Sequence, residues 1–380
     1  MNRKQFVILL VLVVVVGAAG LLIRQRNESS WQSGGAAIGQ KLLPNFAVND
    51  VAHIVIKAGT NQLNLAKRDN LWRVQERADY PANFSQISEL LIKLGDLKIV
   101  QSEEVGPSQL GRFELSPATA TTIEFKDQGG KTLASLLLGK KHMAKPPKNS
   151  QFSGMGDEGW PDGRYVMVGA DAKNVAVISD ALDSVQTKPE QWLNKDFLTI
   201  EKAKSIAVQF PEATNSWMLS RTNETAEWQL AEAQSGEKLD SGKISSVTSP
   251  FSSGSFNDVA PASAASTTSN TVVTVDTLEG FNYVVSIAPK QDDHFPVKFT
   301  VTANLSAART PAANEKPEDK AKLDKEFKDQ QAKLAEKLAR EKAMASWVYE
   351  LPAYSVDEIL KQRHELLAEP STNSVAPAAK

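Results

Sequence analysis

The sequence predicts an α+β protein with an N-terminal transmembrane helix followed by two tandem related domains, each a mostly antiparallel sheet with a packed helix. A long charged helical insertion is expected in the second domain. Three observations predict this class. An 18-residue apolar run lies near the N-terminus, a strand-strand-strand-helix pattern occurs twice, and 380 residues suit two domains of about 150 residues each.

The first copy of the pattern lies between residues 51 and 95. Short alternating apolar segments predict three strands, marked by Ala52, Ile54 and Ile56, then Leu63 and Leu65, then Trp72 and Val74. A helical spacing follows in Ile87, Leu90, Leu91 and Leu94. Asn83 is a suitable N-cap for this helix, and Gln86 follows it three residues later. We therefore expect one face of the helix to pack on the sheet.

The rest of the first domain, residues 46–198, continues with strands. Two alternating segments flank Gln128-Gly129-Gly130, which predicts a β-hairpin. A Gly- and Pro-rich loop at 146–163 leads into strands at 165–168 and 176–178. A helix is expected at 180–186, because Pro189 provides a stop signal after it.

The second domain, residues 199–368, repeats this order. Its strands and helix are marked by Ile206, Val208 and Phe210, by Trp217 and Leu219, by Trp228 and Leu230, and by Ile244 and Val247. The helix expected at 240–251 has a weaker propensity, because it contains Gly242 and four serines. A closing helix is expected at 355–367, with Ser355 and Glu358 as its capping box. Residues 369–380 are expected to be a disordered tail.

The charged insertion covers residues 306–345, and its Lys-, Glu- and Ala-rich part from 315 to 345 is typical of a long exposed helix. A narrow apolar stripe follows one side of this helix, formed by Leu323, Phe327, Leu334 and Leu338. Such a stripe must be covered by other apolar surface. Two alternatives provide that cover: the helix packs on its own domain, or it binds a protein partner. A solvated helix is the third alternative.

The N-terminal apolar run extends from Phe6 to Ile23, and basic residues flank it on both sides. As a helix it would be about 27 Å long, close to the thickness of a bilayer core. We expect residues 1–26 to be a cytoplasmic stub and membrane anchor, and residues 27–45 a flexible spacer. A cleavable signal peptide is the alternative. Both interpretations place the bulk of the chain on the exoplasmic side of the cytoplasmic membrane.

Composition excludes several kinds of function. The net charge of −2 provides no general attraction for nucleic acid, so no nucleic-acid partner is expected. The chain has no cysteine, which excludes disulfides, thiolate metal sites and cysteine nucleophiles. The sequence Gly129-Gly130-Lys131-Thr132 resembles the end of a phosphate-binding loop, but Phe125 stands where the first glycine is required.

Other candidate ligands are scattered along the chain. The four histidines, His53, His142, His294 and His364, show no metal-site spacing, and only Asp292-Asp293-His294 forms a compact cluster. Asp157, Glu158 and Asp162 could hold a hard cation but lack the spacing of an EF-hand. Trp72, Trp217 and Trp228 lie on the apolar side of short strands, which favours core packing over ligand stacking. No catalytic, cofactor-binding or metal-binding residue is assigned, and no cofactor is expected.

A series of short motifs carries a family resemblance over most of residues 50–365. They are Leu71-Trp72-Arg73-Val74, Tyr80-Pro81-Ala82, Phe113-Glu114-Leu115-Ser116-Pro117, Leu137-Leu138-Gly139, Arg164-Tyr165-Val166 and Trp192. In their order the chain resembles the bacterial family known as domain of unknown function 4340. The resemblance implies an exported, membrane-anchored protein associated with ABC-transporter systems of the gliding-motility auxiliary type. It supplies no catalytic residues.

These observations predict a non-enzymatic accessory or scaffold protein that exposes two exoplasmic repeat domains beside an ABC-transporter-type membrane complex. Protein partners are expected, with the helix at 315–345 as one contact surface. The alternative is an exoplasmic module that binds a ligand or the cell wall in a cleft between the two repeats.

Overall fold

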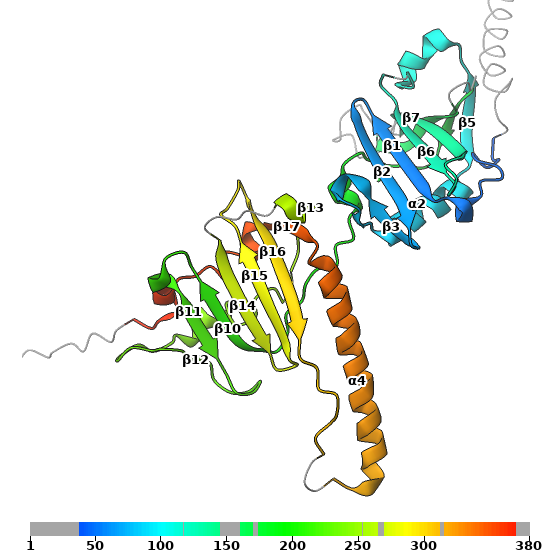
Figure 1. The fold of residues 1–380 in the computed structure, drawn as a ribbon. Helices are drawn as coiled ribbons and strands as arrows, with labels where there is room; N and C mark the ends of the chain where they lie inside the picture. The colour runs from blue at the N-terminus through cyan, green and yellow to red at the C-terminus, as the bar shows by residue number, and fades with distance from the viewer. Residues whose placement is uncertain are drawn as a thin grey trace, which may run out of the picture. The chain divides into compact units, whose positions relative to one another are not determined.

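The computed structural model describes residues 38–116, 118–144, 160–169, 174–252, 254–264, 270–311 and 315–369. The chain divides between Asn194 and Lys195 into two compact units, which are described separately. Each unit is built around one large antiparallel sheet (Figure 1).

Within the described residues, the sheet of unit 1 has nine strands in the order β4-β3-β2-β1-β6-β7-β8-β9-β5. The strands are β1 (His53–Ala58), β2 (Asn61–Arg68), β3 (Leu71–Val74), β4 (Tyr80–Pro81), β5 (Ile99–Glu104), β6 (Thr121–Lys126), β7 (Thr132–Ala144), β8 (Trp160–Val168) and β9 (Asn174–Ile178). Short 3-10 helices connect them, namely η1 (Val48–Asp50), η2 (Gln75–Arg77), η3 (Pro107–Phe113) and η4 (Pro189–Trp192). The expected hairpin is confirmed, since β6 and β7 pair across the turn at Gly129 and Gly130.

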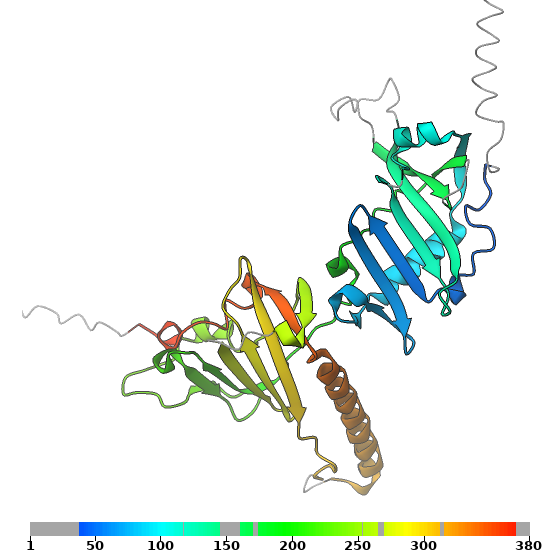
Figure 2. The same cartoon turned by 45° about the horizontal axis from the view of Figure 1, so that its top comes forward.

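Helix α2 (Phe84–Asp96) lies across one face of this sheet (Figures 1 and 2). The Asn83 side chain accepts a hydrogen bond from the backbone N–H of Gln86, which satisfies one free donor at the helix start. The buried residues of the helix are those that the helical spacing predicted: Ile87, Leu90, Leu91 and Leu94. They form the core together with strand residues such as Ile54, Ile56 and Leu65, none of which is exposed.

Residues 38–45, at the end of the expected spacer, pack on unit 1. The backbone N–H of Gly39 donates to Ile99 at 2.8 Å, and that of Leu42 donates to Leu97 at 2.8 Å. Leu42 and Leu43 are buried. The packed part of unit 1 therefore includes residues before Phe46, because the apolar pair Leu42-Leu43 gains from burial beside β5.

Within the described residues, the sheet of unit 2 has eight strands in the order β12-β11-β10-β14-β15-β16-β17-β13. The strands are β10 (Ala203–Gln209), β11 (Trp217–Ser220), β12 (Gln229–Leu230), β13 (Asp258–Pro261), β14 (Thr271–Thr277), β15 (Phe281–Ile287), β16 (His294–Ala303) and β17 (Trp347–Pro352). The helices are α3 (Ser241–Ser245), α4 (Pro317–Met344) and the 3-10 helices η5 (Ala213–Asn215), η6 (Ala262–Ala264), η7 (Ala353–Ser355) and η8 (Arg363–Leu366).

The two sheets have the same connectivity, which confirms the internal repeat. Strands β1, β2 and β3 correspond to β10, β11 and β12, and strands β5 to β9 correspond to β13 to β17 in the same sheet order. The ends of the units also correspond. Leu193 forms a bridge with Ala82 just before α2, and Leu367 forms a bridge with Leu239 just before α3. Helix α4 therefore lies between β16 and β17, where unit 1 has only the connection from β8 to β9.

The expected α+β class is wrong, because the described residues form two large antiparallel sheets with few helices. The predicted transmembrane helix is part of the same correction. Residues 6–23 lie outside the described residues, as do residues 27–37, 145–159 and 370–380. In the described part of the chain, no helix is both long enough and apolar enough to cross a membrane. The membrane-spanning element of the predicted fold thus has no support in the structure.

Three shorter helices were also predicted wrongly. At 180–186 the Asp180 side chain accepts a hydrogen bond from the Leu182 N–H, and this local turn replaces the first turn of a helix. At 355–367 the chain forms turns and η8, and the Lys361 carbonyl accepts a bond from the Trp217 indole instead of a helical N–H. At 240–251 only the five residues of α3 are helical, as the low propensity of its glycine and serines explains.

Candidate interaction surfaces

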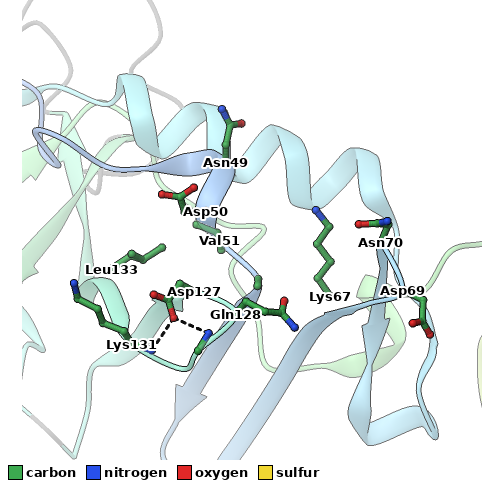
Figure 3. A pocket seen from close by; sticks show the side chains of 12 residues that line it. Asn49, Asp50, Val51, Lys67, Asp69, Asn70, Asp127, Gln128, Lys131 and Leu133 are labelled. Atoms are coloured by element: carbon green, nitrogen blue, oxygen red, sulfur yellow. Dashed lines mark hydrogen bonds between the residues drawn. The ribbon is translucent and has the colours of Figure 1, made fainter.

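A polar hollow of about 750 Å³ opens at the end of the unit 1 sheet where the β2–β3 and β6–β7 turns meet η1 (Figure 3). The Asp127 carboxylate accepts hydrogen bonds from the backbone N–H groups of Gly129 and Lys131, both at 2.9 Å. These amides are therefore already paired with an internal carboxylate. A phosphate at this turn would meet a negative charge.

Three acidic residues, Asp50, Asp69 and Asp127, line the hollow, but their carboxylates do not meet at one point. Figure 3 shows the Asp50 and Asp69 carboxylates on opposite sides of the hollow, with the Lys67 side chain between them. Across the described residues, no group of three or more His, Asp and Glu side chains is arranged to hold a metal ion.

The histidines are placed on separate elements. His53 lies in β1, His142 in β7, His294 in β16 and His364 in η8. Burial lowers the pKa of His53, and its Nε2 has no hydrogen-bond partner in the described part of the chain. His294 follows the turn at Asp292 and Asp293, and its Nε2 lies 4.0 Å from a Glu350 carboxylate oxygen. These locations do not bring the four rings into one cluster.

Of the three acids in the predicted 146–163 loop, Asp157 and Glu158 lie outside the described residues. Asp162 lies in β8, and its Oδ1 is 2.6 Å from the His142 Nδ1 on neighbouring β7. The His142 ring in turn contacts Tyr165 edge-on, with ring centres 5.4 Å apart. Asp162 is therefore engaged with a cross-strand histidine.

The three tryptophans do not share one environment. Trp72 and Trp217 are buried, with 6% and 3% of their surfaces exposed, as the core interpretation predicted. Trp228 is only half-buried, and the Arg221 guanidinium lies 4.7 Å from its ring centre. It lines a hollow of about 680 Å³ beside β12 and α3. Sequence reasoning missed this difference because all three residues stand in similar alternating segments.

Helix α4 is attached to the unit 2 sheet through its C-terminal half. The Tyr283 hydroxyl of β15 donates a hydrogen bond of 2.8 Å to Glu341, which is only 2% exposed. The Lys337 ammonium donates to the Thr199 carbonyl at 3.0 Å and lies 5.4 Å from the Phe281 ring centre. Leu334 of this half is also buried. Lys337 and Glu341 thus fix this half of the helix to the face of the sheet that carries Tyr283 and Phe281.

Burial controls the ionisation of this contact. It raises the pKa of the Glu341 carboxyl, against the opposing effects of the Tyr283 hydrogen bond and the Lys337 charge. Burial also raises the pKa of the Tyr283 hydroxyl, and the Glu341 charge adds to that increase. The tyrosine therefore stays protonated and remains the donor.

The N-terminal half of α4 presents mainly exposed charged side chains. Of its apolar stripe, Leu323 and Phe327 are half-buried, and nearly all the residues around them are exposed. The connection from β16 follows this half of the helix in Figure 1. Arg309 of that connection binds the carboxylates of Glu315 and Asp324, and the contact to Asp324 measures 2.8 Å. This clamp fixes the start of α4 while leaving most of its surface open to solvent.

The expected ambiguity of α4 is therefore resolved in part by geometry. Its C-terminal half packs on its own unit, and a hollow of about 770 Å³ is lined by α4 and by residues of the segment 305–311. The Gln331 Oε1 is buried and has no hydrogen-bond partner within the described residues. Because α4 is 28 residues long, it extends over about 42 Å. The exposed half is the candidate surface for a protein partner.

Comparison with known proteins identifies the family of the chain. The profile of the family described as Domain of unknown function (DUF4340) matches residues 72–152 and 153–271. No curated protein and no solved structure matches the chain. The two matched segments follow one another and together cover more than half of the 380 residues. The chain therefore belongs to the DUF4340 family, as the order of its short motifs predicted.

Proposed function

We propose that this protein is a non-enzymatic accessory scaffold that binds other proteins through helix α4. The observation that supports this proposal is the division of α4 into two halves. Lys337 and Glu341 fix one half to the sheet, and the other half presents charged side chains to solvent. A helix held rigidly in this way loses little conformational freedom on binding, which favours association.

The proposed setting is the exoplasmic side of the cytoplasmic membrane, next to an ABC-transporter-type complex. The apolar sequence of residues 6–23 with its flanking basic residues supports export, and the family resemblance supports the transporter. Neighbouring genes that encode a transporter ATPase and a permease would add independent support.

Co-purification tests this proposal with matched variants. The full chain, isolated from membranes in mild detergent, should retain specific membrane-protein partners. Lys325→Glu with Lys328→Glu changes two exposed charges on the N-terminal half of α4 and should reduce the retained partner at least about tenfold. Lys57→Glu with Lys204→Glu makes the same charge change at exposed strand positions and should leave it unchanged. Purification without any membrane protein, or equal losses in both variants, would contradict the scaffold role.

A further inference from the structure

Strand β3 of unit 1 and strand β12 of unit 2 are equivalent, but only β12 is the last strand of its sheet. Val74 of β3 pairs with Leu65 of β2, and Leu230 of β12 pairs with Leu219 of β11. Val74 and Leu230 are therefore equivalent. Trp72 and Trp228 each precede them by two residues, so the two tryptophans are equivalent as well. The edges can therefore be compared residue by residue.

In unit 1 the edge is closed by β4. Tyr80 pairs with Val74, and the Ala82 N–H donates a hydrogen bond of 2.8 Å to the Trp72 carbonyl. The Tyr80 side chain is 2% exposed and Trp72 is 6% exposed. The added strand thus pairs the backbone of β3 and buries two aromatic rings.

In unit 2 the equivalent segment does not pair with the sheet. The residues just before the N-caps Asn83 and Asp240 correspond, so Glu237 takes the place of Tyr80 and Leu239 that of Ala82. Within the described residues no backbone hydrogen bond joins residues 237–239 to β12, which is the edge of its sheet. The Glu237 carboxylate instead binds the Arg363 guanidinium at 2.7 Å.

The space left by the missing strand is the hollow of about 680 Å³. Trp228, Leu230 and Ile244 supply its apolar wall, and Ser245 and Thr248 of the α3 region contribute hydroxyl groups. Trp228 and Leu230 are half-buried, whereas their counterparts Trp72 and Val74 are buried. An open strand edge beside an aromatic-lined hollow is suited to strand addition, in which backbone bonds provide affinity and one inserted side chain provides selectivity.

We propose that the β12 edge binds an extended segment of a partner protein, with an aromatic side chain of that segment filling the hollow as Tyr80 does in unit 1. This inference deepens the proposed scaffold function and rests on it. The occupant follows from the duplication, because the other copy of the same edge is completed by a short strand that carries tyrosine. The partner segment would add the bonds to β12 that β4 makes to β3.

Disulfide trapping tests the proposal in the full chain, which contains no cysteine of its own. The probe is a synthetic peptide with the sequence of residues 75–83 and cysteine at the position of Pro81. Since Pro81 pairs with Arg73, its counterpart on β12 is the exposed residue Gln229. The variant Gln229→Cys should trap the peptide about tenfold faster than Thr300→Cys, an exposed control position on β16 of the same sheet.

Two further variants make the result specific. For a peptide with alanine at the position of Tyr80, the rate of trapping at Gln229→Cys should fall to the control rate. Glu237→Tyr, added to Gln229→Cys, should let the chain fill its own hollow and should also reduce trapping to the control rate. Equal trapping rates at Gln229→Cys and Thr300→Cys would overturn the proposal. So would a trapping rate that neither the alanine peptide nor Glu237→Tyr reduces.

The scaffold function is separable from this site. Lys325→Glu with Lys328→Glu, added to Gln229→Cys, should leave peptide trapping unchanged, because both charges lie on α4. Failure of trapping while α4 still retains its partner would remove only the strand-addition site. Loss of partner binding alone would remove only the role of α4.

Discussion

Helices α2 and α4 contact sheets of the same connectivity, but they come from different points in the chain and use different chemistry. Helix α2 precedes β5 and buries four aliphatic residues. Helix α4 lies between β16 and β17, and of its residues only Leu334 and Glu341 are buried. The sheets also differ at one equivalent position. By the strand registers, Tyr283 of unit 2 stands where unit 1 has Ala134. Unit 2 therefore has both the tyrosine and the Glu341 carboxylate that it binds, and unit 1 has an alanine in place of the tyrosine.

The comparison shows that sheets of the same connectivity can hold a helix in two ways, by an aliphatic core or by a few buried polar groups. Aliphatic packing along α2 gives unit 1 a closed core, because the hydrophobic effect rewards every buried methylene group. The contact of α4 depends on a few buried polar groups, which leaves the rest of a long helix available. Unit 2 therefore carries both of the surfaces that we propose for partners, α4 and the β12 edge.

The largest expected effect separates the two sheet edges. Trp72→Ala should lower the free energy of unfolding of unit 1 by about 3–5 kcal/mol, because it leaves a cavity under β4. Trp228→Ala should cost unit 2 only about 1 kcal/mol, because this ring faces a hollow. Denaturant unfolding followed by far-UV circular dichroism measures both. Equal losses would mean that the β12 edge is as closed as the β3 edge.

A smaller effect is expected at the contact of α4. Tyr283→Phe removes the hydroxyl that binds the buried Glu341 and should destabilise unit 2 by about 1–3 kcal/mol. Tyr354→Phe changes a tyrosine that is 75% exposed and should stay within about 0.5 kcal/mol of the unmodified protein. Thermal unfolding of the two variants compares them directly. A Tyr283→Phe protein as stable as Tyr354→Phe would show that the polar contact does not hold the helix.

The smallest expected effect depends on pH. The pKa of Glu341 is raised by burial, so the folded chain holds this proton more tightly than the unfolded chain. Its contribution to stability is complete below the pKa of an unfolded glutamic acid, about 4.3, and is lost as the pH rises through the folded pKa. Glu341→Gln removes this titration.

The stability of Glu341→Gln relative to the unmodified chain should therefore increase as the pH is raised from about 4 towards neutrality. Urea unfolding of both proteins in steps of pH measures the difference. Parallel curves would show that Glu341 does not titrate with the folding of unit 2.

The sequence determined the parts of this fold that depend on local spacing. The alternation in β6, the hairpin at Gly129 and Gly130, the N-cap Asn83 and the four buried residues of α2 were all predictable, because side-chain direction follows the period of the backbone. The duplication was readable for the same reason. Both copies repeat the spacing, although their residues differ.

Tertiary structure decided what the same spacing becomes in each copy. Trp72 and Trp228 stand in equivalent segments, yet only Trp72 is covered, because Tyr80 adds a strand to β3 and Glu237 does not add one to β12. The chain around Lys361 lost its predicted helix to a hydrogen bond from Trp217, which is 144 residues away. The helix predicted at Asp180, by contrast, was replaced by a local turn through Leu182. Contacts between residues distant in sequence form only when the whole chain folds, and their energies can then outweigh local propensity.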